Sequence, residues 1–165
     1  MGTERLGHGR PALYMLVLWL GVPPVPEMSP SEVLLVEDNA GDALLIRQAL
    51  AESRISVHLQ IARDVDQALQ ILHEPDFKPD LIILDLNLPR TSGYSVLGLG
   101  LKKTPVVVFT ASLKETDEER ALSLGAKEFV HKPSELEAYK TAVCRFVRKW
   151  AYPKDRGEAV RNCEG

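Results

Sequence analysis

Short, uninterrupted apolar runs recur through the middle of the chain. Three of them, Val33–Val36, Leu81–Leu84 and Val106–Phe109, contain no polar residue. Strands of a parallel sheet have this pattern when helices bury them on both faces. Two weaker strands are predicted at Val57–Ala62, where apolar and polar residues alternate, and at Glu128–His131.

Segments with helical spacing separate these strands. Helices are predicted over Ala40–Ser53, Val65–His73, Thr116–Leu124 and Ser134–Trp150. The first helix brings one apolar set to a common face: Leu44, Leu45, Ala49 and Leu50. The last helix does the same with Leu136, Tyr139, Val143, Phe146 and Val147. Alternation of strands and helices predicts an α/β fold with right-handed crossovers.

The helix after Leu81–Leu84 is expected to be short. Its helical stretch, Tyr94–Lys102, contains Gly98 and Gly100. Each glycine costs roughly 1 kcal/mol relative to alanine inside a helix. We therefore expect a helix of no more than about two turns, loosely held against the sheet.

The first thirty residues have a different pattern. Ala12–Val22 is apolar, and several prolines follow it. About twelve apolar residues cannot span a bilayer, which needs roughly twenty. Arg5 and Arg10 precede the run as in a secretory signal, but no small-x-small cleavage site follows.

Three interpretations of this segment are open. The working protein starts at Met28, or the segment is a signal or surface anchor, or it is a frayed helix. The prediction divides the chain into an N-terminal extension (1–30), one domain (31–150) and a charged tail (151–165) that is too short for an output domain.

Composition excludes several classes of function. Hydrophobic residues make up 45% and charged residues 26%, as in soluble globular proteins. Lys+Arg 20 against Asp+Glu 23 gives a net charge of −3, so no nucleic-acid partner is expected. Cys144 and Cys163 form no disulfide framework, which fits a reducing, cytoplasmic location. No membrane partner is expected. The histidines do not have the spacing of metal ligands.

Polar side chains follow four of the predicted strands at their carboxyl ends, the edge where open α/β sheets bind ligands. They are Glu37 and Asp38, Asp85 with Asn87, Thr110 with Ala111, and Lys132 with Pro133. Any one of these pairs is more often an ordinary turn. Their joint placement favours a site.

The residue types at this edge suit phosphoryl chemistry. Three carboxylates would repel and raise one another's pKa unless a cation joins them. An oxygen-only ligand set suits Mg²⁺. With a lysine and a hydroxyl beside it, an aspartate can act as a covalent phosphoryl acceptor.

Four motifs carry a resemblance to a known family. VLLVEDN, LIILDLNLPR, VVVFTAS and GAKEFVHKP resemble the response-regulator receiver family of two-component signalling, over about Glu32–Trp150. The resemblance implies a flavodoxin-like (βα)5 fold, a doubly wound parallel sheet with strand order 2-1-3-4-5.

The resemblance also implies an acceptor and a metal site. Asp85 corresponds to the phosphoacceptor. Glu37 and Asp38 correspond to the acidic pair that holds Mg²⁺ together with Asp85 and the backbone carbonyl of Asn87.

A second set of residues corresponds to the family's switch. Thr110 is the switch hydroxyl, and the amide of Ala111 also faces the phosphate. Lys132 pairs with the phosphate, ahead of a proline expected to be cis. Phe129 occupies the aromatic switch position. Because it lacks a hydroxyl, it can signal the switch only by a change in its burial.

The implied function is that of a single-domain response regulator, not an enzyme in the usual sense. It accepts a phosphoryl group from a sensor histidine kinase and binds an unknown downstream protein. The binding face is built by the fourth helix, fifth strand and fifth helix, through which a homodimer is also possible. Val36–Asp42 (VEDNAGD) resembles regulators that serve phytochrome-like kinases, although Asp42 is equally an ordinary acid in a helix first turn.

Two other functions compete with this one. A flavodoxin-like redox protein needs a phosphate-binding loop after the first strand, where this chain has acids. A phosphorylation-independent receiver-like interaction module stays open. The spacing of Gly93, Gly98 and Gly100 matches neither a Walker loop nor a dinucleotide fingerprint.

Overall fold

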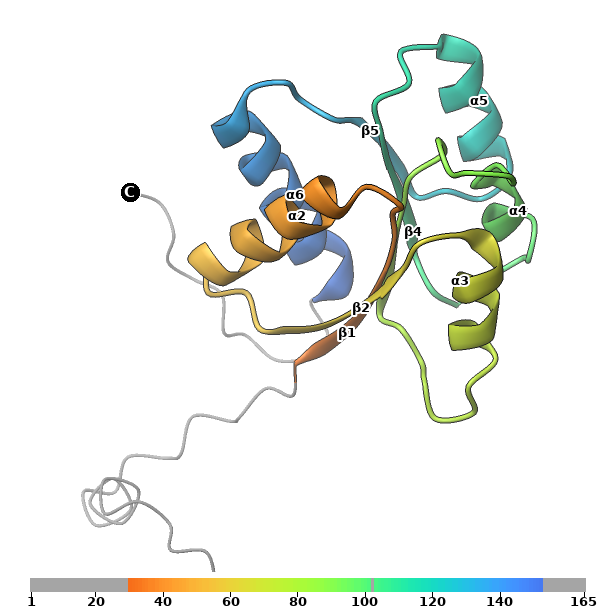
Figure 1. Ribbon diagram of the computed structural model, residues 1–165, viewed down its shortest axis with the longest axis horizontal. Helices are drawn as coiled ribbons and strands as arrows, with labels where there is room; N and C mark the ends of the chain where they lie inside the picture. Colours follow the sequence, from red (N-terminus) through yellow and green to blue (C-terminus); the bar gives the residue numbers. More distant parts are fainter. Residues whose placement is uncertain (1–29, 102, 153–165) are drawn as a thin grey trace, which may run out of the picture.

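Five short strands form one parallel sheet with the order β2-β1-β3-β4-β5, which confirms the predicted flavodoxin-like topology (Figure 1). The computed structural model describes residues 30–101 and 103–152. The strands are β1 (Ser31–Val36), β2 (Val57–Ala62), β3 (Leu81–Leu84), β4 (Val106–Thr110) and β5 (Glu128–His131). All four strand pairs are parallel.

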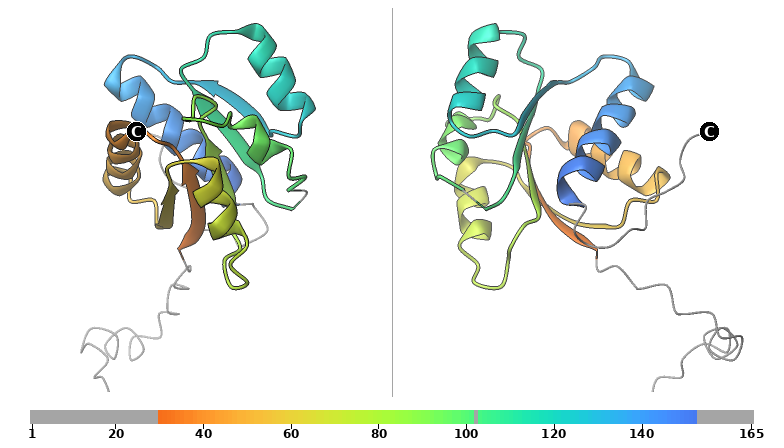
Figure 2. Two further views of the ribbon diagram at one scale, coloured as in Figure 1. Left: turned by 45° about the vertical axis from the view of Figure 1, so that its right-hand side comes forward. Right: turned by 180° about the vertical axis from the view of Figure 1, so that it is seen from behind.

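Helices cover both faces of the sheet (Figures 1 and 2). On one face lie α2 (Ala40–Glu52) and α6 (Leu136–Ala151). On the other lie α3 (Val65–Leu72), α4 (Tyr94–Leu97) and α5 (Glu115–Ser123). Because the central strands are covered on both sides, every residue of β3 and β4 is buried.

Each face has its own apolar core. The core under α2 and α6 includes Ile46, Phe109 and Phe146. The core under the other three helices includes Ile82 and Val96. The sheet thus separates two cores, and its carboxyl edge lies between them.

Capping residues mark the start of α2 and the end of α5 close to the predicted positions. The side chain of Asn39 accepts hydrogen bonds from the amides of Gly41 and Asp42 and so caps α2. After α5, Gly125 has a φ of +102°, a left-handed conformation that favours glycine. Except for α4, the observed elements agree with the predicted ones to within two residues at each end.

The α4 helix has only 4 residues, which confirms the expected limit of two turns. Gly98 ends it, and Gly100 follows with a φ of +63°.

Two predicted helix faces need correction. Leu44 is 55% exposed and Leu136 is 47% exposed, although the pattern assigns each to the common apolar face of its helix. In α2 the buried stripe runs through Ala43, Ile46 and Ala49. Leu44 comes one position after Ala43, so it is rotated by about 100° from Ala43 and lies still further from the rest of the stripe.

The expectations for the N-terminal extension and for nearly all of the tail concern residues outside the described ranges. Among the helices that the structure describes, none is long and apolar enough to cross a membrane.

Candidate functional site

The carboxyl ends of four strands bring the predicted polar residues to one edge of the sheet. Parallel pairing sets Val36 beside Leu84, so Glu37 and Asp85 follow neighbouring strands. The same pairing sets Thr110 beside His131, directly before Lys132.

Among the predicted acids, Asp85 is second only to Glu37 in burial. Its residue is only 5% exposed. Its Oδ1 accepts hydrogen bonds from the Thr110 hydroxyl (2.8 Å) and from the Asn87 amide (3.0 Å). Its Oδ2 accepts one from Lys132 Nζ (2.7 Å). Both carboxylate oxygens therefore point at donors.

Lys132 lies at the centre of the site and its side chain is 8% exposed. Its Nζ is 2.6 Å from Glu37 Oε2, 2.7 Å from Asp42 Oδ2 and 2.7 Å from Asp85 Oδ2. An ammonium group has three donors, so all of them are used. Burial alone would lower the pKa of Lys132, but the hydrogen bonds to Asp42, Asp85 and Glu37 outweigh it and the pKa is raised.

Glu37 is 2% exposed. Burial raises the pKa of its carboxyl, and the neighbouring Lys132 opposes that rise. Its Oε1 accepts a hydrogen bond from the Asn39 amide at 3.0 Å. Glu37 is therefore fixed between the end of β1 and the start of α2.

The donor set at this edge fits a hard divalent cation. Carboxylate oxygens of Glu37, Asp42 and Asp85 all lie within 4.8 Å of one another. They surround a single ammonium, which leaves two negative charges uncompensated when all are ionised. Oxygen ligands of this kind are those that Mg²⁺ takes in proteins.

The structure brings together only part of the predicted metal set. Glu37 and Asp85 share the contact with Lys132, whereas Asp38 and Asn87 are exposed and make no contact with that ammonium. Asp42, which sequence reasoning left open as an ordinary helix residue, joins instead. Its position three residues after the cap Asn39, in a first turn that starts beside the sheet edge, was the signal for it.

The predicted switch residues lie on either side of Asp85. Thr110 is fully buried, and its Oγ1 also accepts a hydrogen bond from the Ser112 amide (3.3 Å). Ala111 is exposed and follows directly. Phe129 is half-buried, with its ring edge-on to His131 at 5.2 Å.

The peptide bond before Pro133 is trans, and none of the peptide bonds in the described residues is cis. The expected cis proline is therefore wrong. An X-Pro bond prefers trans by only about 0.5–1 kcal/mol, so the residue type alone does not decide the isomer.

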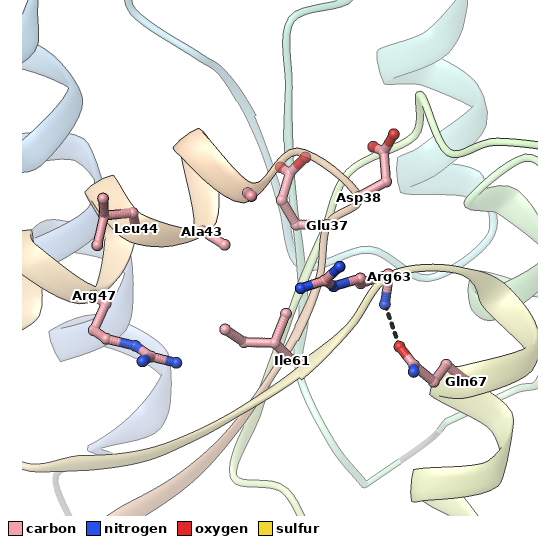
Figure 3. Close-up of a pocket in the computed structure, with 9 residues that line it drawn as sticks. Glu37, Asp38, Ala43, Leu44, Arg47, Ile61, Arg63 and Gln67 are labelled. Atoms are coloured by element: carbon pink, nitrogen blue, oxygen red, sulfur yellow. Dashed lines mark hydrogen bonds between the residues drawn. The ribbon is translucent and has the colours of Figure 1, made fainter.

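A pocket of about 320 Å³ opens beside the acids, between α2, β2 and the start of α3. Figure 3 shows Glu37 and Asp38 at one end of it and Arg47 with Ile61 at the other. Arg63 lies between them, and its amide donates to Gln67 Oε1. The pocket thus reaches Glu37 and Asp38, whereas Asp42, Asp85 and Lys132 are not among its lining residues.

The sheet order and the acids, hydroxyl and lysine at its carboxyl edge define a receiver-type α/β domain. The profile of the response regulator receiver domain matches residues 33–144, and the chain belongs to this family.

Two relatives show the similarity along the sequence. The response regulator Rcp1 of Synechocystis sp. is 36% identical over 118 residues, which covers 66% of this chain and 80% of Rcp1. The probable methanogenesis regulatory protein FilR2 of Methanothrix harundinacea is 34% identical, over 73% of this chain and 84% of FilR2.

Solved structures show the same fold. The phosphorylated cyanobacterial phytochrome response regulator RcpA superposes with a TM-score of 0.70 at 32% identity, covering 75% of this chain and 96% of RcpA. The Mn²⁺-bound form of Rcp1 gives a TM-score of 0.68 at 34% identity, over 74% of this chain and 96% of Rcp1.

Proposed function

We propose that the chain acts as a single-domain response regulator whose Asp85 accepts a phosphoryl group from a sensor histidine kinase. The observation that carries the proposal is the set of donors at Asp85: the Thr110 hydroxyl, the Asn87 amide and the Lys132 ammonium. Donors aimed at the oxygens where charge develops are what phosphoryl transfer requires. The similarity to RcpA supports a phytochrome-type kinase as the phosphoryl donor.

The transfer forms one bond and breaks one. A carboxylate oxygen of Asp85 attacks the phosphorus of the kinase phosphohistidine. The P–N bond breaks, the imidazole nitrogen keeps its electron pair, and Asp85 becomes an acyl phosphate. Because the attacking group is a carboxylate, no proton has to be removed from it.

Residues around Asp85 then bind the new phosphoryl oxygens. Lys132 has the largest part, because a full anion is a stronger partner for an ammonium than a shared carboxylate. Thr110 redirects its hydroxyl from Asp85 Oδ1 to a phosphoryl oxygen, and the Ala111 amide donates beside it. Because the acceptor is a side chain of the protein itself, each molecule takes up one phosphoryl group at a time.

Glu37, Asp38 and Asp85, with the backbone carbonyl of Asn87, are the residues we assign to Mg²⁺. When bound, Mg²⁺ supplies positive charge that offsets the negative charge of the phosphoryl oxygens. Two of these residues, Glu37 and Asp85, lie with Asp42 in a group of three carboxylates around one ammonium, and this group supports a cation at this edge. The Mn²⁺-bound form of Rcp1 supports it independently.

The output surface is the face formed by α5, β5 and α6. Phe129 lies on β5 and is half-buried, so it can turn further inward when Thr110 moves toward a phosphoryl group. We expect this movement to change the affinity of that face for a downstream protein.

The experiment that tests the proposal adds Mg²⁺ with beryllofluoride or acetyl phosphate to the protein. We expect the amide resonances of Thr110 and Ala111 to shift, and acetyl phosphate to label the protein only when Mg²⁺ is present. Asp85→Asn is the control and should show neither effect. A wild-type protein that responds to neither reagent would favour the phosphorylation-independent interaction module instead.

A further inference from the structure

A second hydrogen-bonded group lies beside the acceptor site, between α4 and α5. The Tyr94 hydroxyl donates to Asp117 Oδ1 at 2.9 Å and lies 3.2 Å from the Asp117 carbonyl oxygen. The Ser112 hydroxyl donates to the other carboxylate oxygen, Asp117 Oδ2. One carboxylate thus joins the short α4 helix to the loop that follows β4.

The loop end of this group is connected to the switch hydroxyl. The Ser112 amide donates to Thr110 Oγ1 at 3.3 Å, and Thr110 Oγ1 in turn donates to Asp85. The Ser112 carbonyl oxygen lies 2.7 Å from His131 Nδ1. Ser112 is therefore held by its amide, its carbonyl and its side chain, two residues after Thr110.

The helix end of the group is fixed to the backbone of the acceptor itself. The Gly93 amide donates to the Leu86 carbonyl at 3.3 Å. A Cβ atom at Gly93 would lie only 2.4 Å from the Asp85 carbonyl oxygen, so this close approach requires glycine. The backbone of Tyr94, the next residue, is therefore held in a fixed position relative to Asp85.

The charge states of the group suit its hydrogen bonds. Burial, together with the nearby Asp117, raises the pKa of Tyr94 to about 12, so its hydroxyl stays a donor at neutral pH. Donation from Ser112 and Tyr94 lowers the pKa of Asp117, which keeps it a carboxylate. The Arg120 guanidinium lies over the Tyr94 ring, 4.1 Å from its centroid, and also restrains the ring.

We propose that Tyr94 and Asp117 are positioning residues for the phosphoryl group on Asp85: through Ser112 they hold the Thr110 hydroxyl and the Ala111 amide in place. This inference rests on the proposed function. The contacts form a closed circuit. It runs from Asp85 along the chain to Leu86, whose carbonyl accepts from Gly93, and then from Tyr94 through Asp117 and Ser112 to Thr110 and back to Asp85. A backbone segment that is held in advance keeps the Ala111 amide beside the developing anion, and the Thr110 hydroxyl then only has to rotate toward it.

If the Tyr94–Asp117 hydrogen bond only joins α4 to α5, the expected results are different. In that case, loss of the Tyr94 hydroxyl lowers stability but leaves phosphoryl binding unchanged. In the positioning role, Tyr94 acts on the site only through Asp117 and the Ser112 hydroxyl. Its effect on phosphoryl binding must therefore depend on whether Ser112 is present.

The experiment measures the apparent dissociation constant for beryllofluoride at saturating Mg²⁺. The proteins are wild type, Tyr94→Phe, Ser112→Ala and the double variant. The matched control is Tyr152→Phe, which removes a hydroxyl that donates to the Ser56 carbonyl before β2, at the opposite edge of the sheet. Thermal melts of each protein report stability separately.

We expect Tyr94→Phe to weaken beryllofluoride binding by roughly two- to tenfold, the effect of one hydrogen bond. Tyr152→Phe should bind like wild type. In the Ser112→Ala background, Tyr94→Phe should cause no further weakening. If Tyr94→Phe does not fold, Asp117→Asn, which keeps the side-chain shape and one acceptor oxygen, takes its place with the same expected weakening.

Two results would overturn the inference alone. In the first, Tyr94→Phe binds beryllofluoride like wild type. In the second, Tyr94→Phe weakens binding as much in the Ser112→Ala protein as it does in the wild type. A wild-type protein that binds no beryllofluoride overturns the proposed function as well, so the two failures are distinguishable.

Discussion

Lys132 compensates three buried or half-buried acids with one charge. A buried ion pair adds little stability compared with apolar packing, but removal of one partner is costly because it leaves the other charge unpaired. Here the removal of Lys132 would leave Glu37, Asp42 and Asp85 facing one another. We therefore expect Lys132 to contribute to stability even without a phosphoryl group.

Lys132→Met keeps most of the side-chain volume and removes the charge. We expect it to lower the free energy of unfolding by about 3 kcal/mol at pH 7. Burial already raises the pKa of Glu37, and in this variant the opposing effect of Lys132 is lost, so the folded pKa of Glu37 lies above its unfolded value. The loss should therefore be greatest at neutral pH and shrink as the pH falls and the acids bind protons.

Urea unfolding at pH 7 and pH 5 measures this loss. Lys78→Met is the matched control, since Lys78 is exposed and makes no ion pair with any of the described residues. Equal stability of Lys132→Met and wild type at pH 7 would show that the acids do not depend on Lys132.

Tyr139 carries a different kind of polar group. It is 4% exposed, and within residues 30–101 and 103–152 its hydroxyl has no hydrogen-bond partner. Burial raises its pKa, so the group stays a neutral phenol. An unsatisfied buried donor is destabilising, and we expect Tyr139→Phe to raise the free energy of unfolding by about 1 kcal/mol.

Denaturant titration tests this expectation, with Tyr152→Phe as the comparison because the Tyr152 hydroxyl does have a partner. Tyr152→Phe should not be stabilised. A loss of stability in Tyr139→Phe would contradict the assignment of its hydroxyl as unpaired.

At the scale of elements, the ends of the helices decide which acids reach the site. Asn39 fixes the start of α2, and the first turn then directs Asp42 at Lys132. Asp38 lies before that turn and is exposed. A linear motif shows that acids follow β1, but the choice between them depends on the direction of the helix.

Glu135 caps α6 with its side chain, which accepts hydrogen bonds from the amides of Glu137 and Ala138. The Ala138 and Glu137 amides lower the pKa of the Glu135 carboxyl below its usual 4.5. A lowered folded pKa contributes stability above the unfolded pKa, and the contribution is lost as the pH falls through the folded pKa.

We therefore expect Glu135→Gln to be less stable than wild type at pH 7. The difference should begin to shrink below about pH 4.5 as the wild-type carboxyl becomes protonated. Unfolding curves at several pH values provide the measurement, and Glu74→Gln at an exposed position outside the helices is the control. A difference that does not change with pH would contradict a role for the charge.

The α4 helix is a single turn and needs its neighbours for stability. Val96 and Leu97 are its buried residues, and Tyr94 ties it to α5. We expect the amides of residues 93–101 to exchange hydrogen well before those of β3 and β4. Equal protection in the three segments would show that α4 belongs fully to the cooperative core.

At the scale of the whole molecule, the sequence predicts the sheet and the position of the site. The apolar runs of β1, β3 and β4 identify buried parallel strands, and parallel strands end at one edge. Glu37, Asp85, Thr110 and Lys132 could therefore be placed together without any coordinates. The order of the strands came from the resemblance to receivers.

Other features depend on three-dimensional detail. The exposure of Leu44 follows from the rotation of α2 against the sheet. The link from Tyr94 to Ser112 through Asp117 joins three segments of the chain, and no periodic pattern marks it. Such contacts between elements are the part that sequence reasoning did not predict.

The central claim is that this edge of the sheet accepts a phosphoryl group on Asp85, and phosphotransfer from a kinase tests it most directly. A phytochrome-type histidine kinase is labelled with ³²P and mixed with the wild-type protein and with Asp85→Asn in Mg²⁺. The account predicts that the label moves from the kinase to the wild-type protein and that chelation of Mg²⁺ blocks this transfer. Asp85→Asn should keep its fold and take up no label. Undiminished labelling of Asp85→Asn would contradict the account, because the acceptor would then be another residue.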